Sequence, residues 1–154
     1  MYFGNNALLN EAARPNIKDG ISSTATLISH LIKFGDDNQK PKQSASWVNT
    51  ILRDNEHLNQ NEISADKSRT NFVKAIKDEF DGKVLSTVNE KLKEDKTGIT
   101  IDHIPEKFSY DNIKDRDKVI KYMIDNLYTE EAADRLKRRG IDIPPEVYKR
   151  CKGK

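Results

Sequence analysis

Cysteine is nearly absent from this chain of 154 residues, because Cys151 is the only one. A single thiol excludes a disulfide within the chain and is typical of proteins in a reducing compartment. The first residues, MYFGNNALLNEAARP, lack the basic region followed by an apolar region that marks a classical signal peptide. The sequence therefore predicts a cytoplasmic protein by default, and export through another kind of signal stays open.

Long apolar runs are missing as well. Hydrophobic residues make up 35% of the chain, aromatic residues make up 7%, and the mean hydropathy is -0.82. The uncharged stretch between Asp19 and Lys33 is shorter than the roughly 20 apolar residues that cross a bilayer, and Ser and Thr dilute it further. The sequence therefore predicts no transmembrane segment, and its length suits a single domain.

The motifs of common catalytic and cofactor sites are absent, since there is no GxGxxG, GxxxxGKS/T or HExxH pattern and no calcium-binding loop. His30, His57 and His103 lie on separate predicted elements and form no metal-site pattern with other ligands. We therefore predict no metal and no cofactor. Cys151, Asp102 and one histidine could be combined into a thiol, imidazole and carboxylate set, but nothing in their spacing brings them together.

One short motif, DKTGITI from Asp95 to Ile101, resembles the phosphorylation loop of P-type ion pumps. In those pumps the aspartate accepts the phosphoryl group at the end of a buried apolar strand. Here the preceding residues, NEKLKE, form a charged helical pattern instead of a strand. A helix end followed by a turn explains the same residues.

The chain does contain repeated helical patterning. Between Gly20 and Phe34, apolar residues recur three and four positions apart and cover more than one face, which predicts a central helix with neighbours on several sides. Amphipathic patterns before and after a polar linker near 36–43 predict further helices, among them 7–14 and 129–140, and the clearest of them lies over 109–127. The predicted fold class is all-α, a single-domain bundle of six or seven short-to-medium helices.

Three connections are predicted between these helices. Asn55 to Asn61 is polar and is expected to form a loop, and Gly82 is expected to break the helical pattern that runs from Asp66 to Leu92. Ile99 to Asp102 alternates like a strand but has no partner segment, so we expect an extended connection. The residues predicted to pack around the central helix are Trp47, Phe72, Ile76, Phe80, Ile120, Ile124 and Leu127.

The residues that predict where helices begin and end are clearest after residue 128. Thr129 is expected to cap a helix that Gly140 closes in a left-handed conformation. Pro145 then starts a short helix, and the last residues, 152–154, are expected to fray. We predict a helical domain over 1–140, with a basic short helix and tail over 141–154 packed on or beside it.

Positive charge is concentrated at the C-terminal end. The whole chain carries a net charge of +2, whereas residues 135–154 hold eight Lys or Arg and two acidic residues. Two short helices joined by a turn invite comparison with helix-turn-helix readers of DNA, but the junction GIDIPP is extended and contains two prolines. A solvated helix end and tail explain the same charges. The residues predicted to contact phosphates or an acidic partner are Arg135, Lys137, Arg138, Arg139, Lys149, Arg150 and Lys152.

Amphipathic helices without a catalytic motif favour a protein that acts by binding. We expect a non-enzymatic helical protein-interaction module, such as an adaptor, a regulator or a small bacterial effector, whose surplus apolar residues form a groove or an oligomer face. The 13 Asn and 19 Lys residues suggest the AT-rich genome of a bacterium or phage. Another protein is the expected partner, and a homo-oligomer is a further option. A nucleic-acid-binding protein that uses 135–154 is the alternative, and a small enzyme with an unrecognised site is the second alternative.

Overall fold

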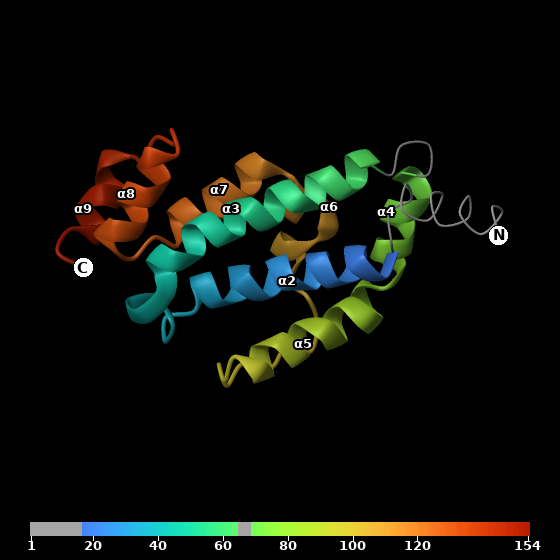
Figure 1. Ribbon diagram of the computed structural model, residues 1–154. Helices are drawn as coiled ribbons and strands as arrows, with labels where there is room; N and C mark the ends of the chain where they lie inside the picture. Colours follow the sequence, from blue (N-terminus) through green and yellow to red (C-terminus); the bar gives the residue numbers. More distant parts are fainter. Residues whose placement is uncertain (1–16, 65–68) are drawn as a thin grey trace, which may run out of the picture.

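The computed structural model describes residues 17–64 and 69–154, and these residues form helices and connections without a β-strand (Figure 1). The all-α fold class is therefore confirmed, while the helix predicted over 7–14 lies outside the described residues. A π-helical turn, η2 (Phe80–Val84), and a 3-10 turn, η3 (Glu106–Phe108), accompany the α-helices. The α-helices are α2 (Ile17–Gly35), α3 (Lys40–Ser64), α4 (Arg69–Asp78), α5 (Leu85–Glu94), α6 (Tyr110–Lys114), α7 (Arg116–Asp125), α8 (Glu130–Arg138) and α9 (Pro145–Cys151).

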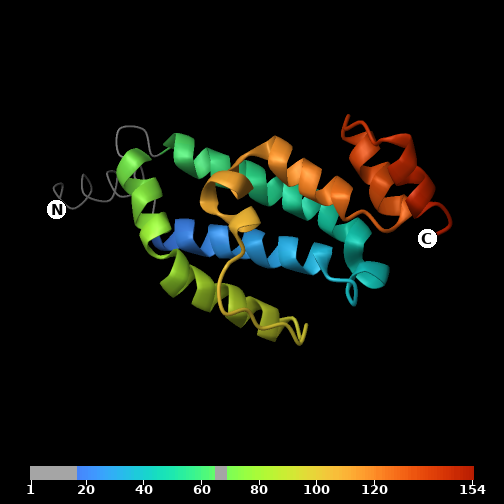
Figure 2. The ribbon, with the colours of Figure 1, turned by 180° about the vertical axis from the view of Figure 1, so that it is seen from behind.

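Helix α2 lies in the middle of the bundle, as the sequence predicts. Figures 1 and 2 show it between α3 on one side and α5 on the other, with α4 at its N-terminal end and α8 and α9 beyond its C-terminal end. Because α2 has neighbours on two opposite sides, its apolar residues are buried over more than one face. The side chains of α2 without exposed surface include Ala25, Leu27, Ile28 and Phe34.

The connection after α2 is shorter than predicted. The polar linker expected over 36–43 ends where α3 begins at Lys40, so Pro41 lies in the first helical turn. A proline is tolerated there because the first N–H groups of a helix have no partner within the helix. The prediction that the linker extends to residue 43 is therefore wrong.

Residues 55–61, predicted to form a loop, continue α3 instead. Leu58 is fully buried, and the buried side chain of Asn55 donates to the main-chain carbonyls of Ile113 at 2.7 Å and Lys114 at 3.0 Å. These carbonyls lie at the end of α6, where they lack partners within their own helix. A pattern of apolar residues does not indicate that a polar side chain such as Asn55 is buried with its hydrogen bonds satisfied. The loop predicted over 55–61 is wrong for this reason.

The last turns of α3 also bind α6 through a buried carboxylate. Glu62 accepts a hydrogen bond from the hydroxyl of Tyr110 at 3.0 Å and pairs with the ammonium group of Lys114 at 2.5 Å. Burial, followed by the charge of Glu62, raises the pKa of Tyr110 above its ordinary value near 10.

We expect this tyrosine to make the protein sensitive to alkaline pH. A group with a higher pKa in the folded state keeps its proton longer than in the unfolded state, so stability is full below about pH 10 and falls above it, by about 1.4 kcal/mol per pH unit. Chemical denaturation of Tyr110→Phe between pH 8 and 11 should show a shallower decline than in the unmodified protein. Parallel declines in the two proteins would contradict the assignment.

The predicted break at Gly82 is observed. Helix α4 ends at Asp78, α5 starts at Leu85, and η2, which contains Gly82, lies between them. The extended connection over 99–102 is also observed, and the side chain of Asn89 on α5 bonds both the N–H and the carbonyl of Ile101 at 3.0 Å. This pair of bonds holds the connection against α5.

The helix predicted over 109–127 consists of two helices. Asp115 is extended and separates α6 from α7, and its carboxylate accepts from the N–H groups of Asp117 at 3.0 Å and Lys118 at 3.2 Å. It therefore caps α7. Because α7 begins there, the residues that it buries differ from those expected of one continuous helix over 109–127. The fully enclosed side chains of α7 are Val119 and Met123, whereas the predicted core residues Ile120 and Ile124 are partly buried. Among the other predicted core residues, Phe72, Ile76 and Leu127 are buried, and Trp47 and Phe80 are partly buried.

The helix ends after residue 128 follow the prediction, but the tail does not. The hydroxyl of Thr129 accepts from the N–H of Ala132 at 3.2 Å, and Gly140 has a φ of 81°. The tail, expected to fray, covers the start of α8, because the N–H of Glu130 donates to the carbonyl of Lys154 at 3.0 Å. This bond satisfies one of the N–H groups that a helix start leaves without an internal partner.

Two glycines allow a matched test of how closely α2 packs against α4. A Cβ at Gly20 would lie 2.8 Å from the ring of Phe72 and 2.9 Å from Ile76, whereas at Gly82 its nearest contact would be Glu79 at 3.6 Å. We expect Gly20→Ala to lower the free energy of unfolding by about 1–3 kcal/mol through overpacking. Gly82→Ala should raise it by about 0.4–1 kcal/mol by restricting the unfolded chain. Urea denaturation measures both, and a stabilising Gly20→Ala would contradict the close approach of α2 and α4.

Candidate functional site

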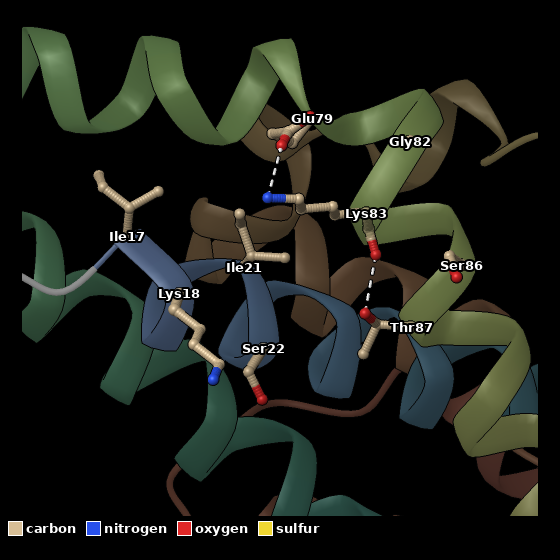
Figure 3. Close-up of a pocket in the computed structure, with 9 residues that line it drawn as sticks. All are labelled: Ile17, Lys18, Ile21, Ser22, Glu79, Gly82, Lys83, Ser86 and Thr87. Atoms are coloured by element: carbon tan, nitrogen blue, oxygen red, sulfur yellow. Dashed lines mark hydrogen bonds and ion pairs between the residues drawn. The ribbon is translucent and has the colours of Figure 1, made fainter.

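An open cavity of about 800 Å³ lies between the start of α2 and the segment that joins α4 to α5. Figure 3 shows Ile17 and Ile21 on the α2 side, with Glu79 and Lys83 across from them. We call this cavity the α2–α5 groove. Its lining residues are Ile17, Lys18, Ile21, Ser22, Glu79, Gly82, Lys83, Ser86 and Thr87.

The groove combines an aliphatic floor with a charged rim. Ile21 is buried, whereas Ile17, at 36% exposure, is the most exposed large hydrophobic side chain of the described residues. Gly82 is small, which leaves the aliphatic surface open. At the rim, the ammonium group of Lys83 lies 3.5 Å from the carboxylate of Glu79, and an exposed pair of this kind contributes at most about 1 kcal/mol. A ligand can therefore displace or engage these charges at low cost.

The groove continues along α5. A second cavity of about 520 Å³ shares Ser86 with the first and is also lined by Asn89, Glu90, Lys93, Gly98, Ile99 and Thr100. The lining positions 79, 83, 86, 90 and 93 are three or four residues apart, and Gly82 lies next to Lys83, so they follow one face of the helical segment. This face, which we call the α5 face, spans about 21 Å at 1.5 Å per residue.

A polar cluster joins α2, α3 and α5 inside the bundle. Lys33 is 3% exposed, its ammonium group bonds the carboxylate of Asp95, and it lies 4.3 Å from the centre of the Trp47 ring. His30 also lies against this ring, at 4.7 Å between ring centres, and it bonds Asp54 through Nδ1 at 2.5 Å. Asp95, the aspartate of the DKTG motif, therefore follows a helix and serves as the counter-ion of a buried lysine.

Three of the seven predicted contact residues at the basic C-terminal end are bound within the protein. Arg135 donates to a main-chain carbonyl of α3 at 3.1 Å, and Arg139 donates to the side chain of Asn49 at 3.2 Å. Arg150 donates to the carbonyl of Ile124, at the end of α7, at 3.0 Å. These guanidinium groups attach α8 and α9 to the rest of the bundle. The remaining four predicted residues are exposed at the surface: Lys137, Arg138, Lys149 and Lys152.

The thiol that sequence analysis considers as a nucleophile is enclosed. Cys151 has no exposed surface, and burial raises its pKa although Arg150 and Lys154 act in the opposite direction. A reactive cysteine needs a thiol that is both accessible to solvent and deprotonated, and the buried environment of Cys151 disfavours access as well as deprotonation.

Alkylation tests this description of Cys151. We expect iodoacetamide to react with the native protein about a hundredfold more slowly than with the protein in denaturant, because the side chain must first be exposed by local opening. Mass spectrometry over time gives both rates. Equal rates would show an accessible thiol and would restore Cys151 as a candidate nucleophile.

Within 17–64 and 69–154, no group of three His, Cys, Asp or Glu side chains is placed to hold a metal ion. In the same part of the chain, no helix combines the length and apolar character needed to span a bilayer.

Comparison with known proteins gave no match to a family model, to a curated protein or to a solved structure. Sequence analysis missed the residues of the α2–α5 groove, and the only signal for them was the pair of small residues Gly82 and Ser86, four positions apart in a strongly charged segment.

Proposed function

We propose that the protein is a non-enzymatic interaction module that binds an amphipathic helix of another protein in the α2–α5 groove. The observation that carries this proposal is the open cavity of about 800 Å³ with Ile17 and Ile21 on one wall. A cleft between two helices suits the apolar face of a third helix. Extended proline-rich peptides use aromatic-lined grooves, and the described residues that line this one include no aromatic side chain. Strand addition needs a sheet edge, and the described residues form no strand.

The dimensions and charges of the α5 face define the expected ligand. A helix that follows its length of about 21 Å contains about 14 residues. The rim carries both signs, with Lys83 and Lys93 alternating with Glu79 and Glu90. We therefore expect a partner helix with apolar residues at i, i+3, i+4 and i+7 and with charges of both signs beside them.

Peptide selection on the full chain tests the proposal without a known partner. Random displayed peptides of 14 residues should be enriched for the helical apolar spacing, and their affinity should fall at least about tenfold for Ser86→Arg, which places a long cation between the two cavities. Ser46→Arg is the matched control, because it adds the same side chain at an exposed position on α3. Failure to enrich peptides, or equal binding to both variants, would overturn the proposal.

A further inference from the structure

We infer that the α5 face of one molecule binds the α5 face of a second copy of the chain, with the two helical segments antiparallel and a two-fold axis at Ser86. The inference goes beyond the proposed function, because it names the molecule that covers the α5 face when no partner helix is bound. In this dimer, Ser86 of one copy lies opposite Ser86 of the other.

The α5 face is exposed along its whole length. Gly82, Lys83, Ser86, Glu90 and Lys93 are all exposed, and the side chain of Lys83 is 73% exposed. The side chains of Glu90 and Lys93 form no hydrogen bond or ion pair with the residues that the structure describes. These two charges are therefore available to a second molecule.

The charges of the α5 face complement one another when two copies run antiparallel. Glu79 and Lys93 lie seven residues before and after Ser86, while Lys83 lies three residues before it and Glu90 four residues after it. With Ser86 on the axis, Glu79 of one copy faces Lys93 of the other, and Lys83 faces Glu90. The two-fold axis produces each pair twice.

Other arrangements of the two segments bring like charges together. In a parallel two-fold dimer, every charge of the face lies opposite its own copy. In an antiparallel dimer shifted by one helical turn, about four residues, Lys83 lies opposite Lys93. Like charges placed opposite each other at an interface are disfavoured, so the charge pattern selects the register with Ser86 on the axis.

Small residues at the centre of the face allow the two segments to approach. Ser86 lies on the axis and Gly82 lies one turn before it, so no long side chain separates the segments there (Figure 3). Helices in contact through small side chains lie about 8 Å apart, at the lower end of the usual range. The first and second cavities lie on either side of Ser86, so the axis places Ile17 of one copy and Ile99 of the other in the same half of the interface.

This dimer should be weak. The α5 face is only about 21 Å long and has no large apolar residue of its own, and exposed ion pairs add little affinity and are weakened by salt. We expect a dissociation constant between about 1 μM and 1 mM at low ionic strength. The amphipathic helix of the proposed function buries more apolar surface and should displace the second copy.

Charge reversal, with sedimentation equilibrium of the full chain as the readout, tests the dimer. Lys83→Glu and Glu90→Lys each turn two attractive pairs into repulsive ones, so each should raise the dissociation constant at least about tenfold. The double variant Lys83→Glu/Glu90→Lys restores opposite charges across the axis and should return the constant to within about threefold of its original value. The two positions are about 10 Å apart along one helical segment, so this recovery reports contact between copies.

Lys121→Glu is the matched control for the charge reversals. Lys121 is an exposed lysine paired with an acidic residue four positions away, as Lys83 is, but it lies on α7. It should leave the dissociation constant within about twofold, because it changes the net charge by the same amount away from the α5 face.

Ser86→Cys gives a second readout of the same axis. Two thiols that meet on a two-fold axis can come within the Cβ separation of about 4 Å that a disulfide needs. Mild oxidation should therefore link two copies at least about tenfold faster than it links Ser46→Cys, whose position on α3 is also exposed. Cys151 is buried and stays unchanged.

Several results would overturn the inference. These are a monomer at protein concentrations up to about 1 mM, a dimer that the single charge reversals leave unchanged, a double variant no tighter than the single variants, and equal oxidation rates at the two cysteine positions. None of these measurements uses a peptide. A failed dimer therefore leaves the peptide selection valid, and a failed peptide selection leaves the dimer valid.

Discussion

Replacing Phe34 with alanine is expected to lower the free energy of unfolding by about 3–5 kcal/mol. The side chain has no exposed surface and lies on α2, which is flanked by α3 and α5. Its removal loses the transfer free energy of the ring and leaves a cavity that the surrounding helices can fill only in part. Denaturation in urea, followed by circular dichroism, measures the loss.

Ile32→Ala is the matched control on the same helix. Its side chain is only partly buried against the core, so the expected loss is smaller, about 1–2 kcal/mol. Equal losses for the two variants would show that α2 does not bury Phe34 more deeply than Ile32. The comparison tests the central position of α2, which is the strongest prediction from the sequence.

Elements specified by neighbouring residues are predicted well. The apolar spacing of α2 lies within a single stretch of 15 residues, and the caps of α8 depend on Thr129 and Gly140, which lie beside the helix they terminate. Pro145 likewise starts α9 through its own restricted backbone. In each case, the interaction joins residues close together along the chain, so the sequence pattern contains the information.

Elements specified by distant residues are not predicted. The second half of α3 depends on a bond from Asn55 to the end of α6, and the tail is ordered by a bond between Lys154 and Glu130. The linear sequence does not show that these groups meet. The same limit applies to the α2–α5 groove, because an open space between Ile21 and Ser86 depends on how two helices pack and not on either helix alone.

Asp95→Asn is expected to lower the free energy of unfolding by about 2 kcal/mol, because it leaves the ammonium group of Lys33 without its counter-ion. Loss of one member of a fully buried pair costs about 3–5 kcal/mol, and the 49% exposure of Asp95 reduces this value through solvent screening. Lys33→Met should cost less than about 1 kcal/mol, since methionine fills a similar volume and its sulfur can pack against Trp47.

The double variant Lys33→Met/Asp95→Asn distinguishes a coupled pair from two independent substitutions. We expect its free energy of unfolding within about 1 kcal/mol of that of the unmodified protein, because no unpaired buried charge remains. Additive losses, or a larger loss for Lys33→Met than for Asp95→Asn, would contradict the coupling. Recovery in the double variant would establish Asp95 as the counter-ion that attaches α5 to α2, a role that depends on a residue 62 positions away and that the local DKTG motif cannot reveal.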